Sequence, residues 1–138
     1  MDIGDIRDSF AFFDSWEDKY RFVIEIGRDL PPLDAALRTD DNLVRGCQSQ
    51  VWLVADYEPA ADRLTFAIDS DAHIVRGLIA IILAAFDQRS PAEILAFDVD
   101  ALFEELELLQ HLSPSRGNGL RAMVSRIRGI AANHVAGA

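Results

Sequence analysis

The chain has 138 residues, half of them apolar, and a formal net charge of −10 with an isoelectric point near 4.5. This size predicts one globular domain over residues 1–138, because the chain can bury a substantial core but is short for two domains. The negative charge disfavours nucleic acid as a partner, and the apolar run at residues 77–86 is too short to span a bilayer, so we expect neither a nucleic-acid nor a membrane partner.

Apolar residues recur at three- and four-residue spacing along much of the chain and predict helices at residues 3–13, 15–30, 72–86, 91–97, 101–109 and 115–135. Ser15 and Ser90 are predicted N-caps, and Asp69 or Ser70 is expected to cap the helix at 72–86. That helix is apolar around most of its circumference, so we expect it at the centre of the fold.

Two runs of residues predict β-strands. Residues 51–57 are mostly apolar and residues 64–68 alternate between apolar and polar, and the segment 58–62 can join the two as a hairpin. A short third strand is predicted at residues 43–45. Together these elements predict an α+β domain in which helices pack around a small antiparallel sheet of about three strands.

Cys47 is the single cysteine of the chain and lies between Gly46 and an apolar run that begins at Val51. One thiol cannot form an internal disulfide, and structural zinc or iron–sulfur sites need several thiolate or imidazole ligands held together. The histidines, His73, His111 and His134, are scattered along the chain. We therefore expect a free thiol and no metal site.

The neighbours of Cys47 favour a loop that presents a reactive thiol. Gly46 can adopt backbone conformations closed to other residues, and Arg45 supplies a nearby cation that favours thiolate. Gln48 and Ser49 add hydrogen-bonding groups around the sulfur. Because inert, buried cysteines are common, these residues alone leave a packing role for Cys47 open.

Two other kinds of function fit the residue types but have weak support. A cysteine hydrolase would combine Cys47 with His111 or His73 and with Asp69, yet three such residues occur in almost any chain of this size. Four arginines make the segment from residue 116 onward basic, as in a nucleic-acid-binding helix. Charge complementarity to the acidic N-terminal segment explains these arginines adequately.

Five blocks of sequence point to a specific family. They are residues 16–20 (WEDKY), 46–52 (GCQSQVW), 70–80 (SDAHIVRGLIA), 97–99 (FDV) and 109–116 (LQHLSPSR). In this order and spacing the blocks resemble the SufE family, the sulfur-acceptor proteins that work with cysteine desulfurases in iron–sulfur cluster biogenesis. The resemblance covers nearly the whole chain and does not separate the SufE branch from the similar CsdE branch.

The resemblance implies a fold similar to iron–sulfur scaffold proteins of the IscU type, with helices around a small antiparallel sheet. It implies that Cys47 accepts sulfane sulfur as a persulfide from a SufS- or CsdA-type cysteine desulfurase and stimulates that enzyme. The sulfur would then pass to an iron–sulfur scaffold or another recipient for cluster assembly. Pyridoxal phosphate would belong to the desulfurase, so we expect no cofactor in this chain, which would act as a sulfur-transfer accessory protein rather than a stand-alone enzyme. A homodimer is left open.

Further residues gain expected roles from the same resemblance. Arg116 and His111 are candidates to stabilise the Cys47 thiolate or to fix its loop. Asp71, expected in the first turn of the helix at 72–86, is a candidate for contact with the desulfurase. Gly46 and the apolar run after the loop suggest that the loop swings outward on docking. A domain that activates a desulfurase without receiving sulfur remains the alternative.

The first residues of the chain lack the basic stretch and apolar run that export requires, so we expect a cytoplasmic location.

Overall fold

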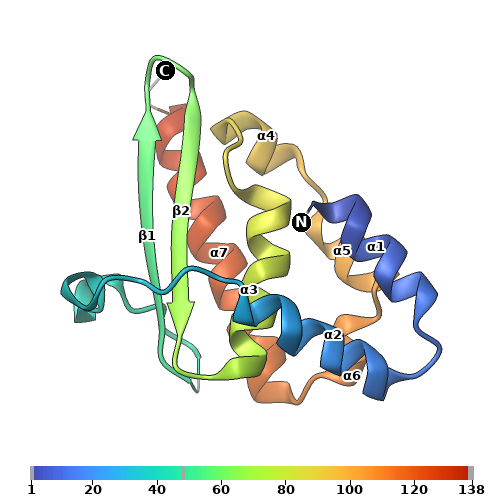
Figure 1. The fold of residues 1–138 in the computed structure, drawn as a ribbon. Coiled ribbons are helices and arrows are strands. Elements are labelled where there is room, and N and C mark those ends of the chain that lie inside the picture. Colours follow the sequence, from blue (N-terminus) through green and yellow to red (C-terminus); the bar gives the residue numbers. More distant parts are fainter. Residues whose placement is uncertain (1, 48, 137–138) are drawn as a thin grey trace.

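The structure, a computed structural model, describes residues 2–47 and 49–136. A central helix, α3 (His73–Phe86), packs beside a β-hairpin, and the other helices surround it (Figure 1). The hairpin consists of β1 (Val51–Glu58) and β2 (Arg63–Ser70), which pair antiparallel along their whole length. The other elements are α1 (Ile3–Phe12), α2 (Trp16–Arg28), the 3₁₀ turns η1 (Ala35–Leu37) and η2 (Asp40–Asn42), α4 (Pro91–Ala96), α5 (Val99–Glu105), α6 (Leu108–His111) and α7 (Pro114–Ala136).

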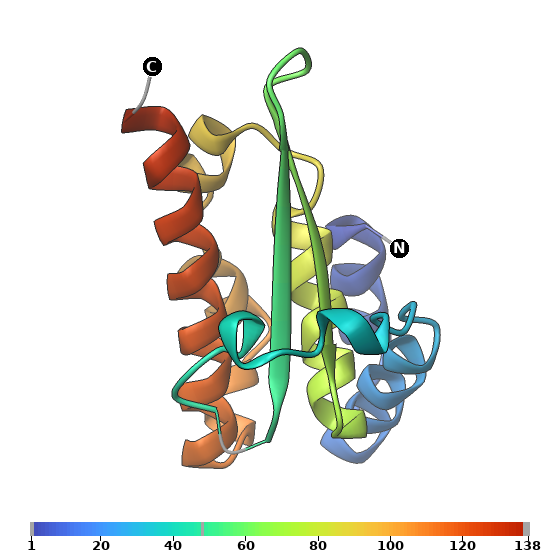
Figure 2. The same cartoon turned by 90° about the vertical axis from the view of Figure 1, so that its left-hand side faces the viewer.

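In the view of Figure 1, α7 lies behind the hairpin and α3 lies beside it. The segment that contains η1 and η2 crosses in front of the hairpin (Figures 1 and 2). Ile79, Ile81 and Ile82 of α3 are completely buried, which confirms that this apolar helix is central. Helices α2 and α3 approach closely at Gly27, where a Cβ atom would lie 2.5 Å from the backbone nitrogen of Gly77. This glycine contact fixes α3, whose N-terminal end lies next to the loop of Cys47.

The predicted α+β architecture is confirmed, as are most of the predicted helices and the hairpin. The side chain of Ser15 caps α2 by accepting the amide of Asp18, and Ser90 forms a full capping box with Glu93 at the start of α4. The helix predicted at residues 101–109 is instead divided into α5 and α6, because Glu107 between them adopts a left-handed backbone conformation (φ 55°).

The prediction of a third strand at residues 43–45 is wrong. Within the described part of the chain the sheet has two strands, and Leu43 forms only an isolated bridge with Trp52. The chain then turns away from the sheet at Gly46, whose φ of +92° lies outside the range of a regular strand.

The predicted cap of α3 is also wrong. The N-cap residue is Ala72, which has no capping side chain, whereas Asp69 and Ser70 belong to β2 and are buried. Ser70 still contributes, because its hydroxyl oxygen accepts the amide of Ala72 at 3.2 Å. Among the described residues, no helix combines the length and apolarity needed to cross a bilayer.

Candidate functional site

Cys47 lies on a tight loop between η2 and β1. The amide of Val44 donates to the carbonyl oxygen of Val51 at 2.8 Å and closes the base of this loop. Gly46 supplies the left-handed turn immediately before the cysteine, as its conformational freedom predicted. The thiol is therefore carried by a short loop with a closed base, which we call the thiol loop (residues 45–50).

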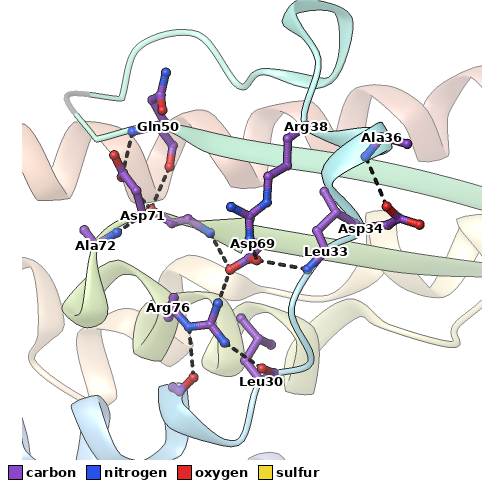
Figure 3. A network of polar contacts seen from close by, with 12 residues as sticks. Leu30, Leu33, Asp34, Ala36, Arg38, Gln50, Asp69, Asp71, Ala72 and Arg76 are labelled. Carbon is purple, nitrogen blue, oxygen red and sulfur yellow. Dashed lines mark hydrogen bonds and ion pairs between the residues drawn. The ribbon is translucent and has the colours of Figure 1, made fainter.

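The second stem of the thiol loop is fixed by the end of β2. The amide of Gln50 donates to Asp71 Oδ1 at 3.2 Å (Figure 3). The Ser70 hydroxyl donates to the carbonyl oxygen of Gln50 at 2.7 Å. Asp71 thus precedes the N-cap Ala72, and its predicted place in the first turn of the helix is wrong by two residues. Its carboxylate is exposed and holds the loop stem through the backbone of Gln50.

The Cys47 thiol is half-buried against α7. Its Sγ lies 3.6 Å from the carbonyl oxygen of Gly119, to which the thiol donates. Burial raises the pKa of the Cys47 thiol, and a carbonyl acceptor also suits the protonated form rather than the thiolate. Gly119 permits this approach, because a Cβ atom there would lie only 3.3 Å from the sulfur. In this position the surroundings of Cys47 favour the neutral thiol over the thiolate.

A cavity of about 110 Å³ opens beside this sulfur. That volume is several times the ~30 Å³ that one water molecule occupies in the liquid, so one additional sulfur atom fits. Five of its lining residues are apolar: Val51, Val75, Leu78, Leu120 and Met123. Ser49, Ser113, Ser115 and Arg116 give the same cavity a polar side. The thiol consequently faces a small pocket with an apolar wall and one cation.

The structure brings together only some of the predicted site residues. Arg116, an exposed residue in the first turn of α7, lines the cavity beside Cys47, and so does Ser49. Arg45 is exposed and lines a second hollow, on the thiol loop, to which Cys47 and Ser49 also contribute. Gln48 lies outside the described residues.

His111 points into a different environment from the thiol. Its ring stacks on Trp16 with 3.8 Å between centroids, and its Nδ1 lies 3.0 Å from the carbonyl oxygen of Glu107. The hydroxyl of Tyr20 donates to the backbone carbonyl of His111. The WEDKY block and the LQHLSPSR block are therefore in direct contact, and His111 packs against α2 rather than facing Cys47.

The arrangement gives the cysteine-hydrolase alternative no support. Asp69 is completely buried and accepts the amide of Leu33 at 2.9 Å, a nitrogen of Arg38 at 2.8 Å and a nitrogen of Arg76 (Figure 3). His73 is exposed at the start of α3. Asp69, the acid that a cysteine hydrolase would need, instead binds Leu33, Arg38 and Arg76.

The Asp69 network was not foreseen from the sequence. Burial of Asp69 opposes ionisation, but the amides of Leu33 and Ser70 and the guanidinium groups of Arg76 and Arg38 outweigh it and lower the pKa of Asp69. The only sequence signal was an aspartate in place of an apolar residue at the end of a strand. The network joins the segment that leads into the thiol loop to β2 and α3.

Two arginines of α7 donate hydrogen bonds to backbone carbonyl groups. Arg126 donates to the carbonyl oxygens of Leu43 and Asp41, both at 3.2 Å, and Arg128 donates to those of Phe97 and Leu95. These two side chains bind backbone carbonyl groups, and one of the carbonyls that Arg126 binds belongs to Asp41 in the acidic N-terminal segment. Within residues 2–47 and 49–136, no cluster of three or more His, Cys, Asp or Glu side chains has the arrangement of a metal site.

Comparison with known proteins gives a consistent result. Residues 4–131 match the family model of SufE, described as an Fe-S metabolism associated domain. An uncharacterized SufE-like protein of Rhizobium meliloti (strain 1021) is 49% identical over 128 residues, which cover 91% of each chain. A second uncharacterized SufE-like protein, from Rhizobium etli, is also 49% identical over 128 residues and is covered over 86% of its length.

A solved structure shows the same fold at low identity. The solution structure of a hypothetical protein from Thermus thermophilus matches with a TM-score of 0.75 and covers 96% of this chain and 94% of its own. Because the two sequences are only 16% identical, this match concerns the fold alone. The family model and the relatives at 49% identity show that the chain belongs to the SufE family, with a role in iron–sulfur metabolism.

Proposed function

We propose that Cys47 accepts sulfane sulfur from the active-site persulfide of a cysteine desulfurase and carries it to an iron–sulfur scaffold or another recipient. One observation carries this proposal: the only cysteine of a SufE-family chain lies on a loop, with its sulfur beside a cavity of about 110 Å³. A buried packing cysteine would have neither the loop nor the adjacent space.

The proposed transfer is a thiol exchange. The Cys47 thiolate attacks the terminal sulfur of the donor persulfide, and a new bond forms between Cys47 Sγ and that sulfur. The sulfur–sulfur bond of the donor breaks, and its electron pair leaves on the donor cysteine as thiolate. The transferred atom keeps its oxidation state, so the step needs no oxidant or reductant. Pyridoxal phosphate, which generates the donor persulfide, belongs to the desulfurase in this proposal.

The two environments available to Cys47 suit storage and reaction respectively. Against α7, burial and the carbonyl group of Gly119 favour the neutral thiol, which is a poor nucleophile, and the cavity shields a bound persulfide. When docking draws the thiol loop outward, the desolvation is relieved and the pKa falls toward its ordinary value. Arg116, which lines the cavity with Cys47, then offers a positive charge to the emerging thiolate. The loop movement therefore exposes and activates the sulfur in one step.

Sulfur removal also explains how this chain would stimulate a desulfurase. A desulfurase that holds a persulfide on its active-site cysteine cannot begin another cycle until that sulfur leaves. An acceptor that reacts faster than solvent thiols shortens this stage of the cycle. Stimulation is then a consequence of transfer and should depend on the Cys47 thiol.

The test is intact-mass measurement under non-reducing conditions after incubation with a cysteine desulfurase and free cysteine. We expect an adduct of one or more sulfur atoms on the protein and none on the Cys47→Ser variant, which should also fail to stimulate the desulfurase. Omitting the desulfurase controls for direct reaction with cysteine. Full stimulation by Cys47→Ser, with no adduct on the original protein, would instead establish an activator that receives no sulfur.

A further inference from the structure

The thiol loop lies along one face of α7. Three residues of that helix, Gly119, Ala122 and Arg126, are spaced three and four apart and therefore share a face. Gly119 accepts the Cys47 thiol, and a Cβ atom on Gly46 would lie 3.4 Å from Ala122 Cβ. Arg126 reaches the backbone before the loop. The chain from η2 to Cys47 thus runs antiparallel to this face of α7.

Arg126 binds the carbonyl groups at the end of η2. The carbonyl oxygen of Asp40 accepts the amide of Leu43 within this turn, whereas the oxygens of Asp41 and Leu43 accept the two terminal nitrogens of the guanidinium group. A planar guanidinium can hold two acceptors at fixed positions, which the single ammonium group of lysine does less well. Arg126 therefore fixes the direction of the chain as it enters the thiol loop.

We propose that Arg126 is a positioning residue that clamps the first stem of the thiol loop, so that outward movement is confined to the residues between Val44 and Gln50. This inference rests on the proposed function, in which that loop moves. The opposite stem has contacts of its own, because Gln50 is bonded to Asp71 and Ser70, and the Val44–Val51 hydrogen bond joins the two stems. Both stems are thus attached to the folded body, and the cysteine lies between them.

The clamp limits how far the sulfur can travel. Cys47 is the third residue after Val44, and an extended chain spans at most about 3.5 Å per residue, so its Cα can lie no more than roughly 10 Å from that anchor. A donor cysteine must therefore come within that distance, plus the length of the side chain. Release of the stem would lengthen the reach and would also let the thiol leave its cavity without a partner.

The test compares Arg126→Ala and Arg126→Lys with the matched control Arg128→Ala. Arg128 lies two residues further along the same helix and also donates to two backbone carbonyls, but those belong to Phe97 and Leu95, far in sequence from the loop. The measurement is the rate of Cys47 alkylation by iodoacetamide, together with the thermal midpoint of each variant. No desulfurase is required, so the result does not depend on sulfur transfer.

We expect alkylation of Arg126→Ala to be about tenfold faster than that of the original protein, because loss of hydrogen bonds from a charged donor shifts a local opening equilibrium by roughly this factor. Arg126→Lys should lie between the two, and Arg128→Ala should react at the original rate. Amide hydrogen exchange at Val44 should quicken in Arg126→Ala and not in Arg128→Ala. Equal alkylation rates in Arg126→Ala and Arg128→Ala, or unchanged exchange at Val44, would overturn the clamp even if Cys47 carries sulfur.

Discussion

Replacement of Gly119 by alanine should separate the stability of the fold from the protection of the thiol. Gly119 lies within α7, where alanine is favoured over glycine by about 1 kcal/mol. The new Cβ atom would lie 3.3 Å from Cys47 Sγ and 3.7 Å from Cys47 Cβ. The same substitution therefore favours the helix and crowds the resting position of the sulfur.

The two effects act on different equilibria. Overpacking costs about 1–3 kcal/mol, and the lower end applies here because Cys47 is on a loop that can shift. A penalty of about 1 kcal/mol on the inward position raises the ratio of outward to inward loop about fivefold. In the free energy of unfolding this penalty counts at most in full, while the inward position predominates, and the gain in helix propensity offsets it. We expect the free energy of unfolding to change by between about 0 and +1 kcal/mol.

Gly129→Ala is the matched control, because no atom lies within 4 Å of a Cβ at that exposed position of the same helix. It should gain the helix propensity and leave the thiol unaffected. Urea unfolding gives the stability of both variants, and iodoacetamide alkylation gives the exposure of Cys47. If Gly119→Ala is alkylated no faster than Gly129→Ala, the resting contact between the sulfur and α7 does not exist in solution, and the proposed storage position is wrong.

Three further predictions concern the loop and its support. Burial raises the pKa of Cys47 in the folded protein, so the thiol of the unfolded chain ionises first as the pH rises above about 8.5. The free energy of unfolding should therefore fall with rising pH from about 8.5 until the pH passes the folded-state pKa. Urea unfolding at several pH values should show this decrease in the original protein and not in Cys47→Ser. Gly46→Ala should lower the free energy of unfolding by about 1–2 kcal/mol, because alanine is strained at the φ of +92° that Gly46 adopts. Gly46→Asn should lower it by less, and equal losses in the two variants would contradict backbone strain as the cause. Asp69→Asn should destabilise by about 3–5 kcal/mol because it leaves Arg76 without its buried partner, whereas Glu17→Gln in an exposed pair should cost at most about 0.5 kcal/mol. Because the pKa of Asp69 is lowered in the folded protein, ionised Asp69 stabilises the fold above about pH 4, and this stabilisation is lost as the pH falls further. The stability of Asp69→Asn should lack this loss in acid. Similar losses of stability in Asp69→Asn and Glu17→Gln would refute the buried pairing.

Much of the fold follows from local sequence. Ser15 and Ser90 start helices because a hydroxyl can accept an amide three residues ahead, and this depends on neighbouring residues alone. The strands at 51–58 and 63–70 follow from apolar residues in the spacing of a half-buried hairpin. The third strand at 43–45 failed as a prediction because Leu43 and Val44 are compatible with a strand, whereas the turn at Gly46 ends the pairing after one bridge.

The sequence by itself determined that one thiol follows a glycine on a loop and that its surrounding blocks are those of the SufE family. Only the tertiary structure decided what the thiol contacts. The partner Gly119 is 72 residues away, and Arg126 and its carbonyl acceptors are 83 and 85 residues apart. His111, which shares the sequence block of Arg116, instead stacks on Trp16. Contacts over such separations depend on where a whole helix docks on the core, and neither composition nor periodicity records that position.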